Sequence, residues 1–410
     1  MKFLQKPEGV EDFLINKSKK KREMENKIVD LFELWGYKEV KVPMIEYART
    51  YYESQKDHRM FQFSDEMGYT MSLRPDFTPS IARLASTYFN SEKYFPIRLC
   101  YAGPVFRITK PKKGERKESF QAGVESIGER GPSSDGEIVA LACEGLKAMG
   151  LDDFIISLGH VGFMDTLLQE LGLKEIDQDK VKEVLNRRNL VEYEVIVEDL
   201  SLDKDSKMIL EELPEFQGER DKLQELIDRF PGRKFSQSLQ ELDEIFEIVE
   251  EYGLRDKINF DLSLLRRPGY YTGFIMEGYS SKTGFPLCGG GRYDELMSFY
   301  GVEAPATGFA FFLDKLLDVL EYEKEEYSMA SIFLSYDKDL KNKAIEYAKE
   351  KRNENRSLLM DLNPVSYEKA REKAMDLNVR EIHYMSKDKI IKEKLDFENL
   401  DKEGGRGHEK

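Results

Sequence analysis

Five strand-like runs crowd the first third of the sequence, and this crowding limits the folds open to the chain. They cover residues 37–42, 60–63, 69–73, 97–106 and 120–126. In these runs apolar residues alternate or cluster between turn-forming residues, as is typical of strands. Helical spacing marks 17–35 and 134–149, and a turn followed by a helix is expected over 75–87. Because the strands follow one another more than they alternate with helices, we predict an antiparallel-rich sheet with helices packed on it.

Residues 164–252 have a different character from the strand-rich region before them. They are charged and leucine-rich, with apolar residues at helical spacing and almost no strand signal. The strand pattern then resumes at 258–262 and 270–276. We therefore predict one sheet domain, formed by 1–163 and 253–322, that is interrupted by a helical insertion.

The last part of the chain alternates regularly between strand and helix signals after a charged connector at 321–328. The expected strands are 331–336, 357–362 and 381–385, and the expected helices are 338–352 and 366–377. Such alternation is typical of a parallel sheet with crossover helices. We predict a small α/β module over 329–396, and we expect the glycine- and charge-rich residues 397–410 to be disordered.

The composition argues against several classes of function. The 410 residues carry a formal net charge of -15, which weighs against a protein that mainly grips phosphate backbones. Cys100, Cys143 and Cys288 form no C-x-x-C pair, so we expect buried thiols in a reducing compartment and no zinc site. No run of about 18 apolar residues is present. We therefore expect a cytoplasmic protein with no membrane partner and no metal.

Several segments combine polar side chains with strand or turn signals, as binding sites do. They cover residues 72–78, 101–125, 266–273, 288–294 and 308–315. The glycine triplet within 288–294 (Cys-Gly-Gly-Gly-Arg-Tyr-Asp) lacks the G-K-[ST] ending of a P-loop and the G-x-G-x-x-G of a dinucleotide fold. We expect it to form a tight turn where two backbones approach closely.

In order and spacing, these segments resemble the histidyl-tRNA synthetase family of class II aminoacyl-tRNA synthetases. The matching peptides are the opening at 7–12, the dimer-forming first motif around 42–46, the second motif at 101–125, the third at 308–315, and the histidine-specific peptides at 270–271 and 290–294. The resemblance covers nearly the whole chain. It implies an α/β (α+β) fold with a class II synthetase-like antiparallel sheet core, a helical insertion, and a shortened anticodon-binding-like module.

Histidine offers an ammonium, a carboxylate and an imidazole, and each needs its own partner. A carboxylate on the protein suits the ammonium, and the forked donors of arginine suit the ligand carboxylate. The resemblance assigns Asp76 and Thr78 to the ammonium, with Gln121 bridging to the carboxylate. It assigns Arg266 to the carboxylate.

The imidazole needs one donor and one acceptor in fixed places. The resemblance assigns Glu125 to one ring nitrogen and Tyr270 or Tyr271 to the other side of the ring. Asp76 stands where the synthetases usually have glutamate, which keeps the charge but shortens the reach. Taken singly, two such tyrosines are more often core residues. Glu125 or Arg266 taken singly is more often part of a surface ion pair, which contributes roughly 0–1 kcal/mol. Only their joint placement predicts a histidine pocket.

Three departures from the family's motifs indicate that the ATP-binding half of the synthetase site is no longer active. Arg107 of the second motif remains, but Thr109 replaces the glutamate two residues on. The third motif ends in Lys315 instead of arginine, and lysine cannot stack or bind bidentately as a guanidinium does. Gly269 replaces the aspartate before the paired tyrosines. Adenylation depends on positioning and on charge stabilisation at the phosphates, so we predict no catalytic residue and no cofactor.

The loop of the second motif is basic, with Lys113 and Arg116 among its cations and Glu115 as its one acid. Together with Arg107 and Lys315, these cations are candidates for a remnant anion or nucleotide site, or for contact with an acidic partner. A merely solvated loop is the alternative.

The family has two main branches, working synthetases and a paralogue that regulates ATP phosphoribosyltransferase, the first enzyme of histidine biosynthesis. The departures favour the second branch. The resemblance then implies a non-catalytic subunit that binds L-histidine, forms a homodimer, and joins the short-form catalytic subunit in a larger hetero-oligomer. No tRNA partner is expected, because the last module has no marked basic excess. An active histidine–tRNA ligase and a stand-alone histidine-binding protein stay open as alternatives.

Overall fold

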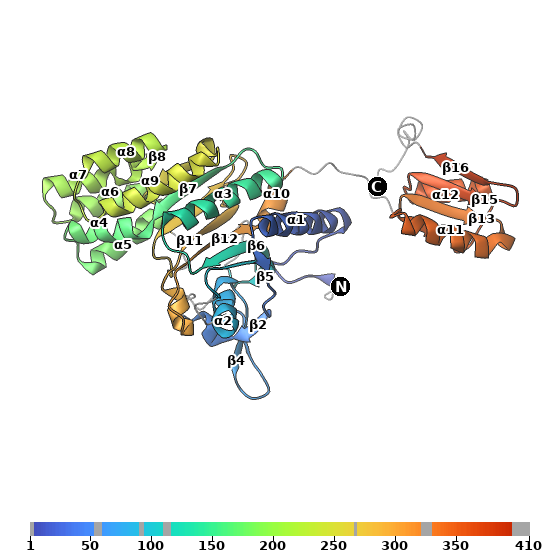
Figure 1. Cartoon of the computed structure of the whole chain (residues 1–410), viewed down its shortest axis with the longest axis horizontal. Helices are drawn as coiled ribbons and strands as arrows, with labels where there is room; N and C mark the ends of the chain where they lie inside the picture. The colour runs from blue at the N-terminus through green and yellow to red at the C-terminus, as the bar shows by residue number, and fades with distance from the viewer. Residues whose placement is uncertain are drawn as a thin grey trace. The chain divides into compact units, whose positions relative to one another are not determined.

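The computed structural model describes residues 4–52, 60–89, 94–109, 116–265, 269–320 and 330–395. The chain divides into two compact units, Met1–Glu321 and Tyr322–Lys410, and each is described by itself (Figure 1). The expected tail at 397–410 lies outside the described residues. No helix in the described ranges is long and apolar enough to span a membrane.

A nine-stranded sheet forms the centre of the first unit. Its strands are β1 (Lys38–Glu39), β5 (Ile97–Phe106), β6 (Glu118–Ile127), β7 (Ile155–His160), β8 (Gln217–Gly218), β9 (Ile258–Asp261), β10 (Phe274–Tyr279), β11 (Cys288–Arg292) and β12 (Ala306–Phe312). They are ordered β1-β5-β6-β12-β11-β10-β7-β9-β8. Only β1 with β5 and β7 with β9 pair in parallel. The antiparallel centre agrees with the prediction from the crowded strand-like runs.

Among the helices that pack against this sheet (Figure 1) are α1 (Ile15–Leu34), α3 (Pro132–Ala148) and α10 (Leu313–Val319). In α1 the buried residues are Met24, Ile28 and Phe32, four apart, so they form one apolar stripe. The Phe32 ring stacks on Phe311 of β12 with 6.3 Å between ring centroids. The apolar spacing within 17–35 therefore predicts both the helix and the face that it buries.

Between β7 and β9 the chain is helical. The helices are α4 (Val161–Glu170), α5 (Glu175–Asn186), α6 (Leu190–Asp199), α7 (Lys204–Glu212), α8 (Arg220–Arg229) and α9 (Ser236–Glu251). Figure 1 shows them gathered beside β7, and α9 packs on α3. Strand β8 is not expected from the sequence, because two residues carry no periodicity; it pairs with β9.

A small antiparallel sheet precedes the polar segment at 72–78. It consists of β2 (Ile45–Tyr47), β3 (Gln62–Ser64) and β4 (Thr70–Leu73), in the order β2-β4-β3. Helix α2 (Thr78–Tyr88) follows after a short turn, as the sequence predicts. The turn brings Asp76 and Thr78 to the start of α2, where both are buried.

Two local predictions are wrong. The glycine triplet forms no turn but is part of β11, whose five residues are all buried. The expected close backbone approach is present, since a Cβ at Gly290 would overlap the Gly308 carbonyl of β12. The expected strand at 270–276 begins only at Phe274, so Tyr270 and Tyr271 belong to the preceding loop.

The second unit alternates strands and helices: β13 (Ile332–Tyr336), α11 (Lys341–Asn353), β14 (Leu358–Met360), α12 (Tyr367–Asp376), β15 (Glu381–Met385) and β16 (Ile390–Lys394). The order is β14-β13-β15-β16, and the first three are parallel, as predicted. Strand β16 pairs antiparallel with β15 at the edge. It is absent from the sequence-based expectation because its sequence, Ile-Ile-Lys-Glu-Lys, is mostly charged.

Candidate functional site

Glu125 lies in the middle of the main sheet. Its strand, β6, is flanked by β5 and β12, where Leu99 and Gly308 are its register partners. The side chain is only 2% exposed. A carboxyl group in such a position needs hydrogen-bond donors to offset the loss of water.

Three hydroxyl groups supply these donors. Thr78 Oγ1 donates to Glu125 Oε1 at 2.7 Å, and the Tyr101 hydroxyl is 3.4 Å from the same oxygen. The Tyr293 hydroxyl donates to Oε2. Burial nevertheless raises the pKa of Glu125 to about 8, because the hydrogen bonds only partly offset desolvation, and the charge of Asp76 adds to the rise.

Glycines on the neighbouring strands leave room for these polar groups. A Cβ at Gly308 would overlap Glu125 Oε2, and one at Gly123 would lie 2.5 Å from the Tyr101 hydroxyl. Since side chains alternate along a strand, positions 121, 123 and 125 share one face of β6. The missing side chains therefore keep this face of the sheet open around Glu125.

Asp76 and Tyr270 form a second polar pair close to Glu125. The Tyr270 hydroxyl donates to Asp76 Oδ2 at 3.2 Å, although the two residues are 194 positions apart. The Tyr270 ring lies 5.0 Å from that of Tyr271 and 5.8 Å from that of Tyr293, between ring centroids. Burial, and then the charge of Asp76, raise the pKa of Tyr270, so its hydroxyl stays a donor.

Gln121 lies on the same face of β6 and is 3% exposed. Within the described part of the chain, its Oε1 atom is buried without a hydrogen-bond partner. Buried polar atoms are usually paired, so an orphan of this kind suits a site that a ligand completes. Arg266, the expected partner of a ligand carboxylate, lies outside the described residues.

The structure describes six of the seven residues that the resemblance assigns to histidine, and five of them make contacts within the cluster. Thr78 with Glu125 and Asp76 with Tyr270 are joined directly, while Gln121 shares a face and Tyr271 a ring contact. Tyr101 and Tyr293 belong to the same cluster but are absent from the sequence-based assignment. The signal for both was present in the matching peptides, at the start of 101–125 and within 290–294.

Arg292, the residue before Tyr293, is fixed by buried hydrogen bonds. Its Nε and terminal nitrogen donate to both oxygens of Asp135 in α3, at 2.8 and 2.7 Å, and both side chains are buried. A third hydrogen bond reaches Asp294. This bidentate pair joins β11 to α3 and so positions the adjacent Tyr293.

The cations assigned to a remnant anion site have other partners. Arg107 Nε donates to the Pro75 carbonyl at 2.7 Å, and Lys315 Nζ donates to the Pro286 carbonyl at 3.2 Å. Arg116 lies 2.7 Å from Glu11 and 2.8 Å from Asp318, with Asp314 also within ion-pair distance. Lys113 lies outside the described residues. Arg116, surrounded by carboxylates, is poorly suited to hold a phosphate.

Comparisons with known proteins agree with this fold and identify the family. A family model described as histidyl-tRNA synthetase matches residues 9–316. The ATP phosphoribosyltransferase regulatory subunit of Moorella thermoacetica is 37% identical over 361 residues, covering 87% of this chain and 92% of that protein. That of Caldanaerobacter subterraneus subsp. tengcongensis is 34% identical over 348 residues, covering 83% and 90%.

The chain belongs to the ATP phosphoribosyltransferase regulatory subunits. This result confirms the family and the regulatory role that the sequence predicts for the chain. The relatives are named as regulatory subunits and not as catalytic enzymes. In the described stretches, no group of three or more His, Cys, Asp or Glu side chains could hold a metal ion.

Solved structures confirm the class II synthetase-like fold. A Bacillus halodurans structure titled ATP phosphoribosyltransferase regulatory subunit/histidyl-tRNA synthetase matches with a TM-score of 0.83 and 32% identity, covering 93% of this chain and 98% of that one. Histidyl-tRNA synthetase from Nostoc sp. PCC 7120 matches with a TM-score of 0.80 at 17% identity, covering 95% and 96%. This second likeness shows the fold alone.

Proposed function

We propose that this chain is a cytoplasmic, histidine-sensing subunit that a short-form ATP phosphoribosyltransferase catalytic subunit needs for activity. Free L-histidine binds in the cluster around Glu125 and lowers the activity of the complex. The chain itself does not adenylate histidine. The family supports the regulatory role, and the polar cluster supports the choice of ligand.

The observation that carries the choice of ligand is the set of buried polar groups on one face of β6. Gln121 Oε1 is buried without a partner in the described chain, and Glu125 lies two side-chain repeats further along the same face of β6. Asp76 adds a carboxylate, which suits an ammonium group. A small zwitterion with an imidazole ring supplies a donor for Gln121 Oε1 and an ammonium group for Asp76.

Regulation follows from linkage. If histidine binds one conformation of the complex more tightly than another, it shifts the equilibrium by that difference in affinity. Typical coupling free energies of about 1–3 kcal/mol correspond to changes in binding affinity of roughly 5- to 150-fold. Side chains from β6, from the start of α2, from the loop before β10 and from the residue after β11 all contribute to the cluster, so a ligand there can order several elements at once.

We further propose a homodimer that uses the small sheet β2-β4-β3. Aliphatic and aromatic side chains are exposed on it: Ile45 by 48%, Tyr47 by 40%, Phe63 by 42% and Tyr69 by 51%. The rings of Tyr47 and Tyr69 also contact each other, with 5.8 Å between centroids. An apolar patch of this kind is typical of a protein–protein interface.

Calorimetric titration of the purified chain with L-histidine tests the site. We expect saturable binding that Glu125→Ala abolishes while the dimer persists in sedimentation. Glu211→Ala, an exposed change in α7, serves as the matched control and should bind normally. Histidinol, which lacks the carboxylate, should bind more weakly. Unchanged affinity of Glu125→Ala would show that histidine does not use this cluster.

A further inference from the structure

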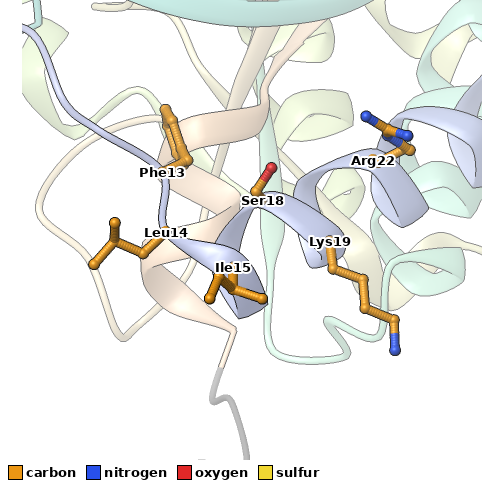
Figure 2. A pocket seen from close by; sticks show the side chains of 6 residues that line it. All are labelled: Phe13, Leu14, Ile15, Ser18, Lys19 and Arg22. Carbon is orange, nitrogen blue, oxygen red and sulfur yellow. The ribbon is translucent and has the colours of Figure 1, made fainter. Parts of the chain in front are cut away.

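A shallow hollow of about 520 Å³ lies at the start of α1. Figure 2 shows the side chains that line it: Phe13, Leu14, Ile15, Ser18, Lys19 and Arg22. All of them come from one stretch of ten residues, so the hollow has a floor but no opposing wall among the described residues. Small-molecule sites usually enclose about 70–90% of their ligand. An open hollow of this kind fits a segment of another protein better.

The hollow is apolar on one side. Leu14 is 76% exposed and its neighbour Ile15 is 58% exposed. Two adjacent aliphatic side chains exposed to this degree form a small hydrophobic patch, while the ring of Phe13 points away from them (Figure 2). Their burial in a complex is favourable, because apolar surface leaves water.

The other side of the hollow is positively charged. Arg22 has no ion-pair partner within the described chain, and Lys19 reaches only Glu23, at 3.9 Å. The first turn of α1 has no acidic residue, and Leu14 at its N-cap supplies no side-chain hydrogen bond. Cations near a helix N-terminus are unfavourable against the helix dipole, so negative charge from outside would stabilise this end of α1.

We propose that this hollow docks an acidic segment of the catalytic subunit that carries an exposed aliphatic or aromatic side chain. The inference rests on the proposed function for the existence of that partner, but not for the location of the contact. Charge complementarity argues for it, because the hollow is lined by cations although the chain as a whole carries a net charge of -15. The apolar residue fills the space beside Leu14 and Ile15, and the acids face Lys19 and Arg22.

Helix α1 lies on the other face of the main sheet from the proposed histidine site, because Phe120 and Gln121 point to opposite faces of β6. Helix α1 packs on β5 and β6. The Lys21 ammonium, one residue from Arg22, lies over the ring of Phe120, which precedes Gln121 in β6. A second, smaller hollow of about 270 Å³, lined in part by Phe13, Lys21 and Phe120, continues from the first toward that strand.

The test measures binding of the purified short-form catalytic subunit to variants of the full chain. Arg22→Glu and, separately, Leu14→Asp should each weaken the complex by about tenfold or more. Lys27→Glu makes the same charge change at an exposed position of the same helix, outside the hollow, and should bind like the wild type. Raising the ionic strength from about 0.1 M to about 1 M, which shortens the Debye length from ~10 Å to ~3 Å, should weaken the wild-type complex more than the Arg22→Glu complex.

Histidine titration of each variant alone separates this inference from the proposed function. The variants should bind histidine normally, which also shows that they fold. Wild-type affinity of both variants for the catalytic subunit would overturn the docking site and leave the proposed function standing. No association of the wild-type chain with the catalytic subunit would overturn both. If the variants instead lost only self-association in sedimentation, the occupant would be a second copy of this chain, and the proposal would be wrong.

Discussion

Gly308 of β12 is the register partner of Glu125 of β6, and its missing side chain leaves the space that the Glu125 carboxyl group occupies. Gly308→Ala should therefore displace that carboxyl group and abolish histidine binding in calorimetry. Gly284→Ala is the matched control, because a Cβ there meets nothing within 4 Å. Normal binding by Gly308→Ala would mean that the position of Glu125 is not needed for the ligand.

Glu125 should also make stability depend on pH. Its pKa rises from 4.5 to about 8 on folding, so the folded state favours the neutral carboxyl. That contribution is complete below about 4.5 and is lost as the pH rises to about 8. The difference in unfolding free energy between wild type and Glu125→Gln should fall over this range and then level off. A difference that stayed constant in urea denaturation series across these pH values would contradict the buried, neutral state.

The buried pair of Arg292 and Asp135 should contribute strongly to stability. Arg292→Ala leaves the Asp135 carboxylate buried without its bidentate partner, which typically costs about 3–5 kcal/mol. Arg187→Ala, at a side chain that is 52% exposed, should change the free energy of unfolding by less than about 1 kcal/mol. Urea denaturation of the two variants gives the comparison, and equal effects would contradict this account of Arg292.

The ATP half of the site should be inactive. We expect no histidine-dependent ATP–pyrophosphate exchange above background, because Thr109, Lys315 and Gly269 stand where a synthetase has glutamate, arginine and aspartate. Lys315 is already bonded to the Pro286 carbonyl. A working histidyl-tRNA synthetase assayed in parallel is the positive control. Robust exchange would show that the three replacements are tolerated in an active enzyme.

Strands with strong local patterns could be predicted from the sequence. The run at 97–106 coincides with β5, and that at 120–126 lies within β6. The glycine triplet could not be predicted as part of a strand, because glycine favours turns and has low strand propensity. It lies in β11 because the strand packs too closely against Gly308 and Tyr271 to admit side chains, and this is a property of the assembled sheet.

Some residues of the site could likewise be predicted from the sequence, and others could not. The resemblance identifies Thr78, Glu125, Asp76 and Tyr270, which the structure brings together in pairs. It does not identify the hydroxyl of Tyr293, whose bond to Glu125 spans 168 positions and depends on the register of three strands. Arg116 illustrates the opposite case. Its basic loop suggests an anion site, yet carboxylates from α10 and from Glu11, distant in sequence, surround it.

The most direct test of the account is phosphoribosyl transfer by the short-form catalytic subunit, assayed with and without this chain and with added histidine. We expect little activity for the catalytic subunit alone, restored activity on mixing, and inhibition by histidine that Glu125→Ala removes without loss of the restored activity. Failure of the wild-type chain to restore transfer, or inhibition that persists unchanged in Glu125→Ala, would contradict it.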